Sequence, residues 1–387
     1  MTVQERHMAP GRVDFTLRDE SPRHVVELCR PLVQGQGFGT IVVTPTRLPM
    51  RDVGTAAILA NARFSGRLTG RERRTRVSGD GIVGQLGTDN NQGTVIAPLS
   101  TPTTFATWAT ALLPTYLNAG ITPAAGGGSY TKDFKAVTVR AALDEVCAFF
   151  GGEWRVRPNF TLDVGTRAQL FVTTPKTVVV SRRGEGSREL HLTGLVGDLS
   201  LSEDLEDWER SRMLYYGSGT TSVEQGGLTV AAADVPFREP DGTSAEIRRI
   251  TEDSQITASA DALGLATAEW GKVRYGHREF RASVDAYDVG MHVGVGDSVW
   301  VYAPEQGVFN IANQVRYRGG VIFPESIRCV GRTWPIREGM GIYFRRWVNN
   351  GTTTWGEDWV DLSPYVLPET GDATLELFAV PRKLKVA

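Results

Sequence analysis

Short runs of β-branched and aromatic residues, separated by glycine or proline, recur along most of this sequence and constrain its fold more than any other feature. Runs of this kind predict strands. An early group contains Thr40–Thr44, Gly66–Gly70 and Arg74–Ser78. We expect these strands to pair antiparallel, because the connections look too short for crossover helices. The sequence therefore predicts a mainly β protein, built on a barrel or a sandwich.

A different pattern appears between about residues 100 and 165, where apolar residues recur at helical spacing. One stripe begins at Phe105 and should end near Pro114, which cannot continue a helix. A clearer stripe covers residues 139–150, with Thr138 as its expected N-cap and Gly151-Gly152 as its left-handed end. These signals predict two helices.

Two further elements have local signals of their own. Directly after the second helix, apolar and charged residues alternate over 153–157 and again over 160–164, with Pro158-Asn159 between them. This pattern predicts a β-hairpin. Later in the chain, apolar residues at helical spacing suggest one short helix that ends near Gly271; they are Ala262, Leu263, Ala266 and Trp270.

The charge balance excludes several classes of partner. Forty-two Lys and Arg residues oppose 44 Asp and Glu residues, so the formal charge of −2 provides no bulk field for nucleic acid or an anionic membrane. No run approaches the roughly 18 apolar residues of a membrane span, and the first residues lack a signal peptide's apolar stretch. We therefore expect no membrane-spanning segment and synthesis in the cytoplasm.

The residues that carry chemistry in enzymes do not form a recognisable constellation. Cys29, Cys147 and Cys329 are far apart and form no CxxC pair, which argues against a zinc module or a disulfide framework. A glycine-rich stretch at 79–84 has the spacing of a dinucleotide-binding turn but no apolar helix after it. None of the five histidines lies in a motif for nucleophilic or zinc-dependent hydrolysis. We therefore predict no catalytic, cofactor-binding or metal-binding residue and no cofactor.

The last 50 or so residues, from about Trp334, are unusually aromatic. They contain Trp347, Trp355 and Trp359 in a short segment of β character. Such density suggests a small separate β module or an interface arm, with core packing favoured for the three tryptophans. Stacking of these residues on a sugar is the alternative.

The order of four segments resembles a known family of structural proteins. They are residues 62–70, 77–86 and 139–156, followed by the Gly296-Asp297 turn and the strand after it. In this order they resemble the tail-hub proteins of long-tailed bacteriophages, often called minor tail proteins, including baseplate hubs and the N-terminal parts of tail-associated lysins. The resemblance covers about residues 10 to 330.

The resemblance implies a subunit with two similar tube-forming β-barrels, an α+β insertion and a small C-terminal β module. Three subunits would make a ring of six barrels that continues a sixfold tail tube and forms part of the DNA channel. The expected partners are further copies of the chain, a distal tail or tail-tube protein, downstream tip or receptor-binding proteins, and passing DNA in transient contact. The expected location is the tail tip of the virion. Gly151, Gly152, Gly296 and Asp297 are the expected structural turns.

The corresponding domain limits follow from these patterns. We expect part of the first barrel at 1–100, the insertion at 101–185, a return to the first barrel and a connection at 186–240, the second barrel at 241–334, and an aromatic-rich extension at 335–387. Two alternatives remain open. One is a tail-tip cell-wall hydrolase, and the other is a receptor- or carbohydrate-binding tip protein that uses Trp347, Trp355 and Trp359 as its contact surface.

Overall fold

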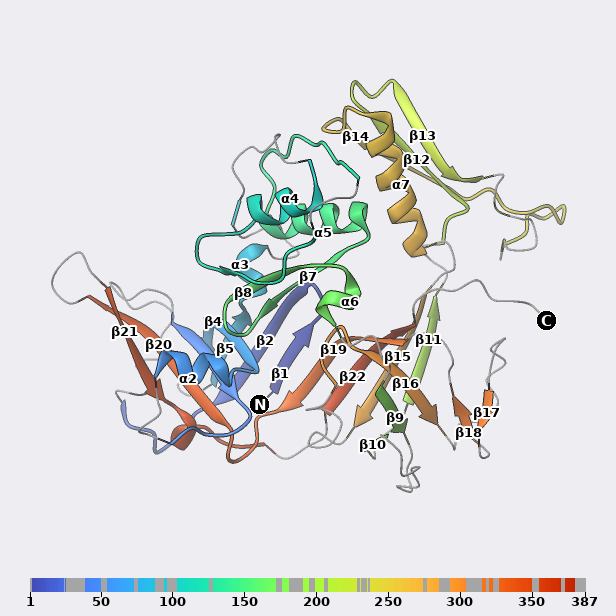
Figure 1. Cartoon of the computed structure of the whole chain (residues 1–387). Helices are drawn as coiled ribbons and strands as arrows, with labels where there is room; N and C mark the ends of the chain where they lie inside the picture. The colour runs from blue at the N-terminus through green and yellow to red at the C-terminus, as the bar shows by residue number, and fades with distance from the viewer. Residues whose placement is uncertain are drawn as a thin grey trace.

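The fold is known from a computed structural model of the whole chain. The structure describes residues 2–23, 25, 39–49, 54–72, 76–87, 94–95, 103–124, 128–171, 176–180, 191–194, 199–204, 208–227, 230, 235, 237–273, 277–284, 293–303, 315–317, 320–322, 327–349, 355–369 and 373–379. The protein is mainly β, as the sequence predicts. A long curved sheet forms the base, and two smaller units that contain the larger helices lie on one side of it (Figure 1).

The base is one continuous sheet of sixteen strands in the described part of the chain. Its main path runs β10-β9-β16-β19-β1-β2-β5-β4-β3-β20-β21, and β11, β15, β17, β18 and β22 attach beside this path. The early strands pair antiparallel as predicted, β3 with β4 and β4 with β5. The bounds of the first five strands are β1 (Thr2–Arg6), β2 (Ala9–Thr16), β3 (Thr40–Thr44), β4 (Phe64–Glu72) and β5 (Arg76–Gly81). Two short helices lie among these strands, α2 (Thr55–Ala60) and α3 (Val83–Leu86).

The other strands of the sheet come from residue 176 onward. They are β9 (Lys176–Val180), β10 (His191–Gly194), β11 (Leu199–Asp204), β15 (His277–Val284), β16 (Ser298–Ala303), β17 (Val315–Tyr317), β18 (Gly320–Ile322), β19 (Ile327–Pro335), β20 (Gly341–Asn349), β21 (Trp355–Asp361) and β22 (Ala373–Ala379). The pairing of β1 with β19 joins the first strand of the chain to a strand from its last quarter.

The sheet curls around an apolar core. Buried residues from β1–β5, β19, β20 and β22 form one cluster, which a flat sheet could not produce. The short turn η4 (Ser363–Tyr365) after β21 returns to the end of β2, where Arg18 N–H donates to the Tyr365 carbonyl and Leu367 N–H to the Thr16 carbonyl, each at 2.7–2.9 Å. The first half of the sheet therefore approaches closure.

The insertion folds as predicted, with helices followed by a hairpin. It comprises α4 (Phe105–Ala111), β6 (Asn118–Ala119), α5 (Val139–Phe150), β7 (Glu153–Arg157), β8 (Thr161–Gly165) and α6 (Arg167–Leu170). Thr138 caps α5 by accepting from Ala141 N–H, and Gly151 ends it with a φ of 64°. Strands β7 and β8 pair antiparallel across the Pro158-Asn159 turn. Large side chains, including Trp108 and Trp154, fill a separate core.

A second small unit follows β11 and differs from the expected domain plan. Strands β12 (Ser211–Tyr216), β13 (Thr221–Gly226) and β14 (Arg248–Asp253) form their own three-stranded sheet, and α7 (Ser259–Val273) covers one face of it. We call this the α7 unit. The helix is the one predicted from Ala262, Ala266 and Trp270. It lies within 241–334, the range expected for the second barrel, and contacts α5 of the insertion.

The C-terminal strands also differ from the expectation of a separate module. Strand β20 pairs antiparallel with β3, and β22 pairs with both β15 and β19. Residues beyond 335 are therefore part of the main sheet, because they supply hydrogen-bonding partners that its other strands need. The proposed limit at 335 does not coincide with a break in hydrogen bonding.

Candidate functional site

A cavity lies between the insertion and the curved sheet. Its volume is about 510 Å³, and it is lined by the β1–β2 turn, the start of β4, the end of β5, strand β7, and the segments around Phe171 and Gly294. Its lining is strongly cationic, with five arginines and one carboxylate, that of Glu5; the arginines are Arg6, Arg63, Arg155, Arg157 and Arg332. We call this cavity and the charged groups beside it the junction site.

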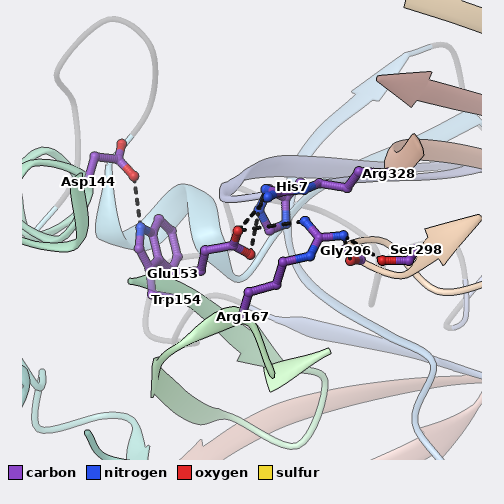
Figure 2. Close-up of polar contacts among 8 residues, drawn as sticks. All are labelled: His7, Asp144, Glu153, Trp154, Arg167, Gly296, Ser298 and Arg328. Carbon is purple, nitrogen blue, oxygen red and sulfur yellow. Dashed lines mark hydrogen bonds and ion pairs between the residues drawn. The ribbon is translucent and has the colours of Figure 1, made fainter. Parts of the chain in front are cut away.

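A buried ionic cluster joins three distant segments at the edge of the cavity (Figure 2). His7 comes from the β1–β2 turn, Glu153 from the start of β7 and Arg328 from β19. Glu153 Oε1 accepts from Arg328 Nη2 at 2.6 Å, and Glu153 Oε2 lies 3.4 Å from His7 Nε2. Arg328 Nη1 also lies 3.1 Å from that same histidine nitrogen. A neutral imidazole can accept there from the guanidinium, whereas a protonated one can donate only to Glu153.

The electrostatics of this cluster favour a neutral histidine beside an ionised carboxylate. Burial lowers the pKa of His7; the nearby carboxylate of Glu153 opposes this effect, and the charge of Arg328 adds to it. Burial alone would raise the pKa of Glu153, but the neighbouring His7 and the charges of Arg328 and Arg167 bring it below its ordinary value. The cluster therefore holds opposite charges on Glu153 and Arg328, with His7 as the group that titrates.

Arg167 links the insertion to a tight turn of the sheet. Its Nη2 donates to the Gly296 carbonyl at 3.3 Å and to Ser298 Oγ at 3.0 Å, and its Nη1 lies 3.8 Å from Glu153 Oε1. Gly296 has a φ of 97°, and a Cβ added there would lie 2.2 Å from the ring of Phe171. Only glycine fits this position without moving a neighbour. The turn therefore lets the end of the insertion approach the sheet closely.

Asp297 completes this turn. Its Oδ2 accepts from Gly294 N–H at 2.9 Å, and its backbone carbonyl accepts from Cys329 N–H at 3.0 Å. The side chain of Asp297 therefore holds the loop that precedes β16, and its backbone joins that loop to β19.

A second buried carboxylate organises the hairpin beneath the cavity. Asp163 is fully buried and accepts from Arg155, from Arg157 through two nitrogens, and from the backbone N–H of Ile121, all at 2.6–2.9 Å. Burial alone would raise its pKa, but these hydrogen bonds, led by Arg157, lower it below its ordinary value. The guanidinium of Arg155 also lies 5.1 Å from the centre of the Phe171 ring. These bonds fix two of the arginines that line the cavity.

The junction site joins distant parts of the chain through ion pairs and hydrogen bonds. Nucleophilic catalysis by serine needs a hydrogen bond from the hydroxyl to a base. Ser65 lines the same cavity as His7, but its hydroxyl has no hydrogen-bonding partner among the described residues. Within the described ranges, no group of three or more His, Cys, Asp or Glu side chains could hold a metal ion. The glycine-rich stretch at 79–84 forms the end of β5 and the four-residue α3.

The four turn residues named from the sequence fall at two places. Gly296 and Asp297 lie in the turn that Arg167 contacts, whereas Gly151 and Gly152 follow the end of α5 and precede Glu153. A Cβ on Gly152 would lie 2.3 Å from the ring of Phe105. The sequence does not predict that four charged or polar residues meet here; they are His7, Glu153, Arg167 and Arg328. The one available signal was the charged face of the β7–β8 hairpin, whose alternation is visible in the sequence.

The C-terminal tryptophans lie in two paired strands. Trp347 is in β20, and Trp355 and Trp359 are in β21. The side chains of Trp347 and Trp355, like residue Cys29, fall outside the part of the chain that the structure describes. Trp359 is half-buried, donates to Thr55 Oγ1 at 2.9 Å and lies against the guanidinium of Arg345. Trp359 therefore has partners within the chain itself.

Two of the three cysteines are described. Cys147 and Cys329 are buried thiols, the former in the core of the insertion and the latter in that of the main sheet. Burial raises the pKa of Cys329 to about 12. In the described segments, no helix has both the length and the apolar content needed to cross a membrane.

Comparison with known proteins identifies the fold. No protein-family model and no curated protein matches the sequence. Among solved structures, a tail protein from Neisseria meningitidis MC58 aligns with a TM-score of 0.54 and 13% identity, covering 97% of this chain and 90% of its own. The 43 kDa tail protein of prophage MuSo2 from Shewanella oneidensis aligns with a TM-score of 0.51 and 9% identity, covering 99% and 94%. This chain therefore shares its fold with two proteins described as tail proteins.

Proposed function

We propose that this protein is a structural component of a bacteriophage-type tail and acts as a hub at the tail tip. The observation that carries the proposal is the shared fold, which extends over 97% and 99% of this chain in two separate alignments to tail proteins. Fold alone does not determine function.

The hub is proposed to be a homotrimer whose two sheet-rich halves per subunit act as two tube-forming barrels. Three copies then present six similar surfaces to a sixfold tail tube, which solves the mismatch between threefold and sixfold symmetry. The strand order supports this arrangement, because the sheet has one half on either side of the β1–β19 pair. The neighbours are a distal tail or tail-tube protein on one side and tip or receptor-binding proteins on the other.

A hub of this kind must let DNA pass without retaining it. The formal charge of −2 supports that requirement, because a strongly cationic chain would bind the phosphate backbone. The contact with DNA is transient in this proposal. The protein is made in the cytoplasm of the bacterial host and resides in the tail of the virion.

The junction site holds the insertion at a fixed angle on the hub in this proposal. The Glu153–Arg328 pair and the Arg167–Gly296 bond each join the insertion to the sheet. Gly296 and Asp297 shape the receiving turn, and Gly151 and Gly152 set the direction in which the chain leaves α5. The four residues are therefore proposed to be structural.

The oligomeric mass of the purified chain tests the proposal. A subunit has a mass of 42.3 kDa, and the proposal predicts a species of three times that mass that dissociates on dilution. Light scattering coupled to size-exclusion chromatography, repeated over a range of concentrations, measures it. A monomer at every concentration contradicts the trimeric hub.

A further inference from the structure

A buried lysine lies between two carboxylates where the insertion meets the α7 unit. Lys132 is only 4% exposed, and its Nζ lies 2.7 Å from Glu145 Oε2 and 2.5 Å from Asp253 Oδ2. The three residues come from a loop of the insertion, from α5 and from the end of β14. The ring of Phe134 lies beside the ammonium group, 5.1 Å from Nζ. The amine of Lys132 therefore lies within hydrogen-bonding distance of two carboxyl groups.

Local hydrogen bonds hold each participant in position. A backbone bridge between Lys132 and Ile256 places the lysine beside the end of β14. Asp253 Oδ1 accepts from the N–H of Gln255 at 3.0 Å, so the other oxygen, Oδ2, is the one that faces the lysine. The hydroxyl of Tyr130 donates to Glu145 Oε1 and leaves Oε2 directed at Nζ. These contacts bring the reacting groups together before any reaction, which is a large part of what catalysis requires.

The reaction starts from a neutral amine and a neutral acid. A proton that moves from the ammonium of Lys132 to the carboxylate of Asp253 produces both, and a neutral lysine amine can act as a nucleophile. Glu145 lies within reach of the same nitrogen and can move protons between the two reacting groups.

We propose that Lys132 and Asp253 form an intramolecular isopeptide bond, with Glu145 as the general base and then the general acid. The lone pair of Nζ attacks Cγ of Asp253, and Glu145 takes a proton from the nitrogen. The charge that develops on Oδ1 is stabilised by the N–H of Gln255. Glu145 then passes the proton to the Oδ2 hydroxyl, the bond from Cγ to Oδ2 breaks, and water leaves. One C–N bond forms and one C–O bond breaks, without oxidant, metal or cofactor.

The bond would fasten the insertion to the α7 unit. Lys132 and Asp253 are 121 positions apart in the sequence, so the cross-link closes a long loop in the unfolded chain. Closing a long loop reduces the conformational freedom of the unfolded chain, as a disulfide does. This attachment is separate from the junction site and does not depend on the role proposed above for the whole protein.

Intact-mass spectrometry of the full-length folded protein tests the proposal. The native chain should be lighter than its sequence mass by one water molecule. Protease digestion should yield one joined peptide that contains both Lys132 and Asp253. The Asp253→Asn variant should reach the same final mass, because it loses ammonia and forms the same amide. The Glu145→Gln variant should keep its full mass. Glu252→Gln makes the same chemical change at the residue before Asp253, and this control should still lose water.

Three results would overturn the proposal. A native chain at full sequence mass with no joined peptide excludes the bond. Loss of water without a joined peptide identifies ring closure at Asp253 and its neighbour Ser254, and also excludes the bond. Full reaction in Glu145→Gln excludes the role of Glu145. Circular dichroism of each variant, together with Glu145→Asp as the conservative replacement that should restore the reaction, separates lost chemistry from lost folding.

Discussion

Replacing Gly296 with alanine should destabilise the attachment of the insertion through two separable effects. The backbone φ of 97° is unfavourable for any L-residue with a Cβ, at about 1 kcal/mol. The new methyl would also lie 2.2 Å from the Phe171 ring. That ring contacts His7 on one side, at 5.2 Å between ring centres, and Arg155 on another. Forcing a group into such packing costs about 1–3 kcal/mol, so the total should be about 2–4 kcal/mol.

Gly339 provides a matched control for the backbone effect. Its φ is 86°, and nothing lies within 4 Å of the position where a Cβ would be. Gly339→Ala should therefore lower the free energy of unfolding only through the backbone conformation, by about 1 kcal/mol. Combining Gly296→Ala with Phe171→Leu should restore part of the loss, because the smaller side chain leaves room for the methyl and makes the two changes non-additive.

Urea-induced unfolding, followed by tryptophan fluorescence, measures the free energy of unfolding of the unchanged protein, Gly296→Ala, Gly339→Ala, Phe171→Leu and the double variant. The reasoning predicts that Gly296→Ala unfolds at a clearly lower urea concentration than Gly339→Ala. Equal losses in the two glycine variants would refute it, since the close approach of Phe171 would then not be what requires glycine. Full additivity in the double variant would refute the same point independently.

Three further predictions concern the charges and turns of the insertion. Asp163→Asn should lower the free energy of unfolding by about 1–3 kcal/mol in chemical denaturation, because its arginine partners lose a buried charged acceptor; a loss under 0.5 kcal/mol would contradict this. Burial lowers the pKa of His7 in the folded protein below its ordinary value of 6.5. Just below pH 6.5 the unfolded chain therefore binds more protons than the folded protein does, and the free energy of unfolding falls as the pH is lowered. His7→Gln should therefore flatten the dependence of unfolding free energy on pH just below 6.5, and an unchanged slope would argue against a buried neutral histidine. Gly152→Ala should lower the melting temperature more than Gly151→Ala, because only the former meets the ring of Phe105.

Local signals account for what the sequence predicts well. The helix over 139–150 carries its own N-cap at Thr138 and its own left-handed end at Gly151, so it needs no distant partner to be recognised. The β7–β8 hairpin is equally local, because its turn and its alternation lie within about a dozen residues. Antiparallel pairing of β3, β4 and β5 follows from the same kind of information.

Long-range pairing accounts for what the sequence does not predict. Strand β20 pairs with β3 across roughly 300 positions of the sequence. Neither strand carries a local pattern from which its partner could be predicted. The same holds for the α7 unit, whose strand β12 pairs in parallel with β14. His7, Glu153 and Arg328 are ordinary charged or polar residues in separate segments, and only the β1–β19 pairing and the position of β7 bring them together.

Electron microscopy of assembled particles that carry a tagged copy of this chain tests the central claim most directly. The hub proposal predicts label at the tip of the tail, with density of threefold symmetry around an open channel and continuous with a sixfold tube above it. Label along the whole tube, label absent from the particle, or a single copy without a central channel would contradict the proposal.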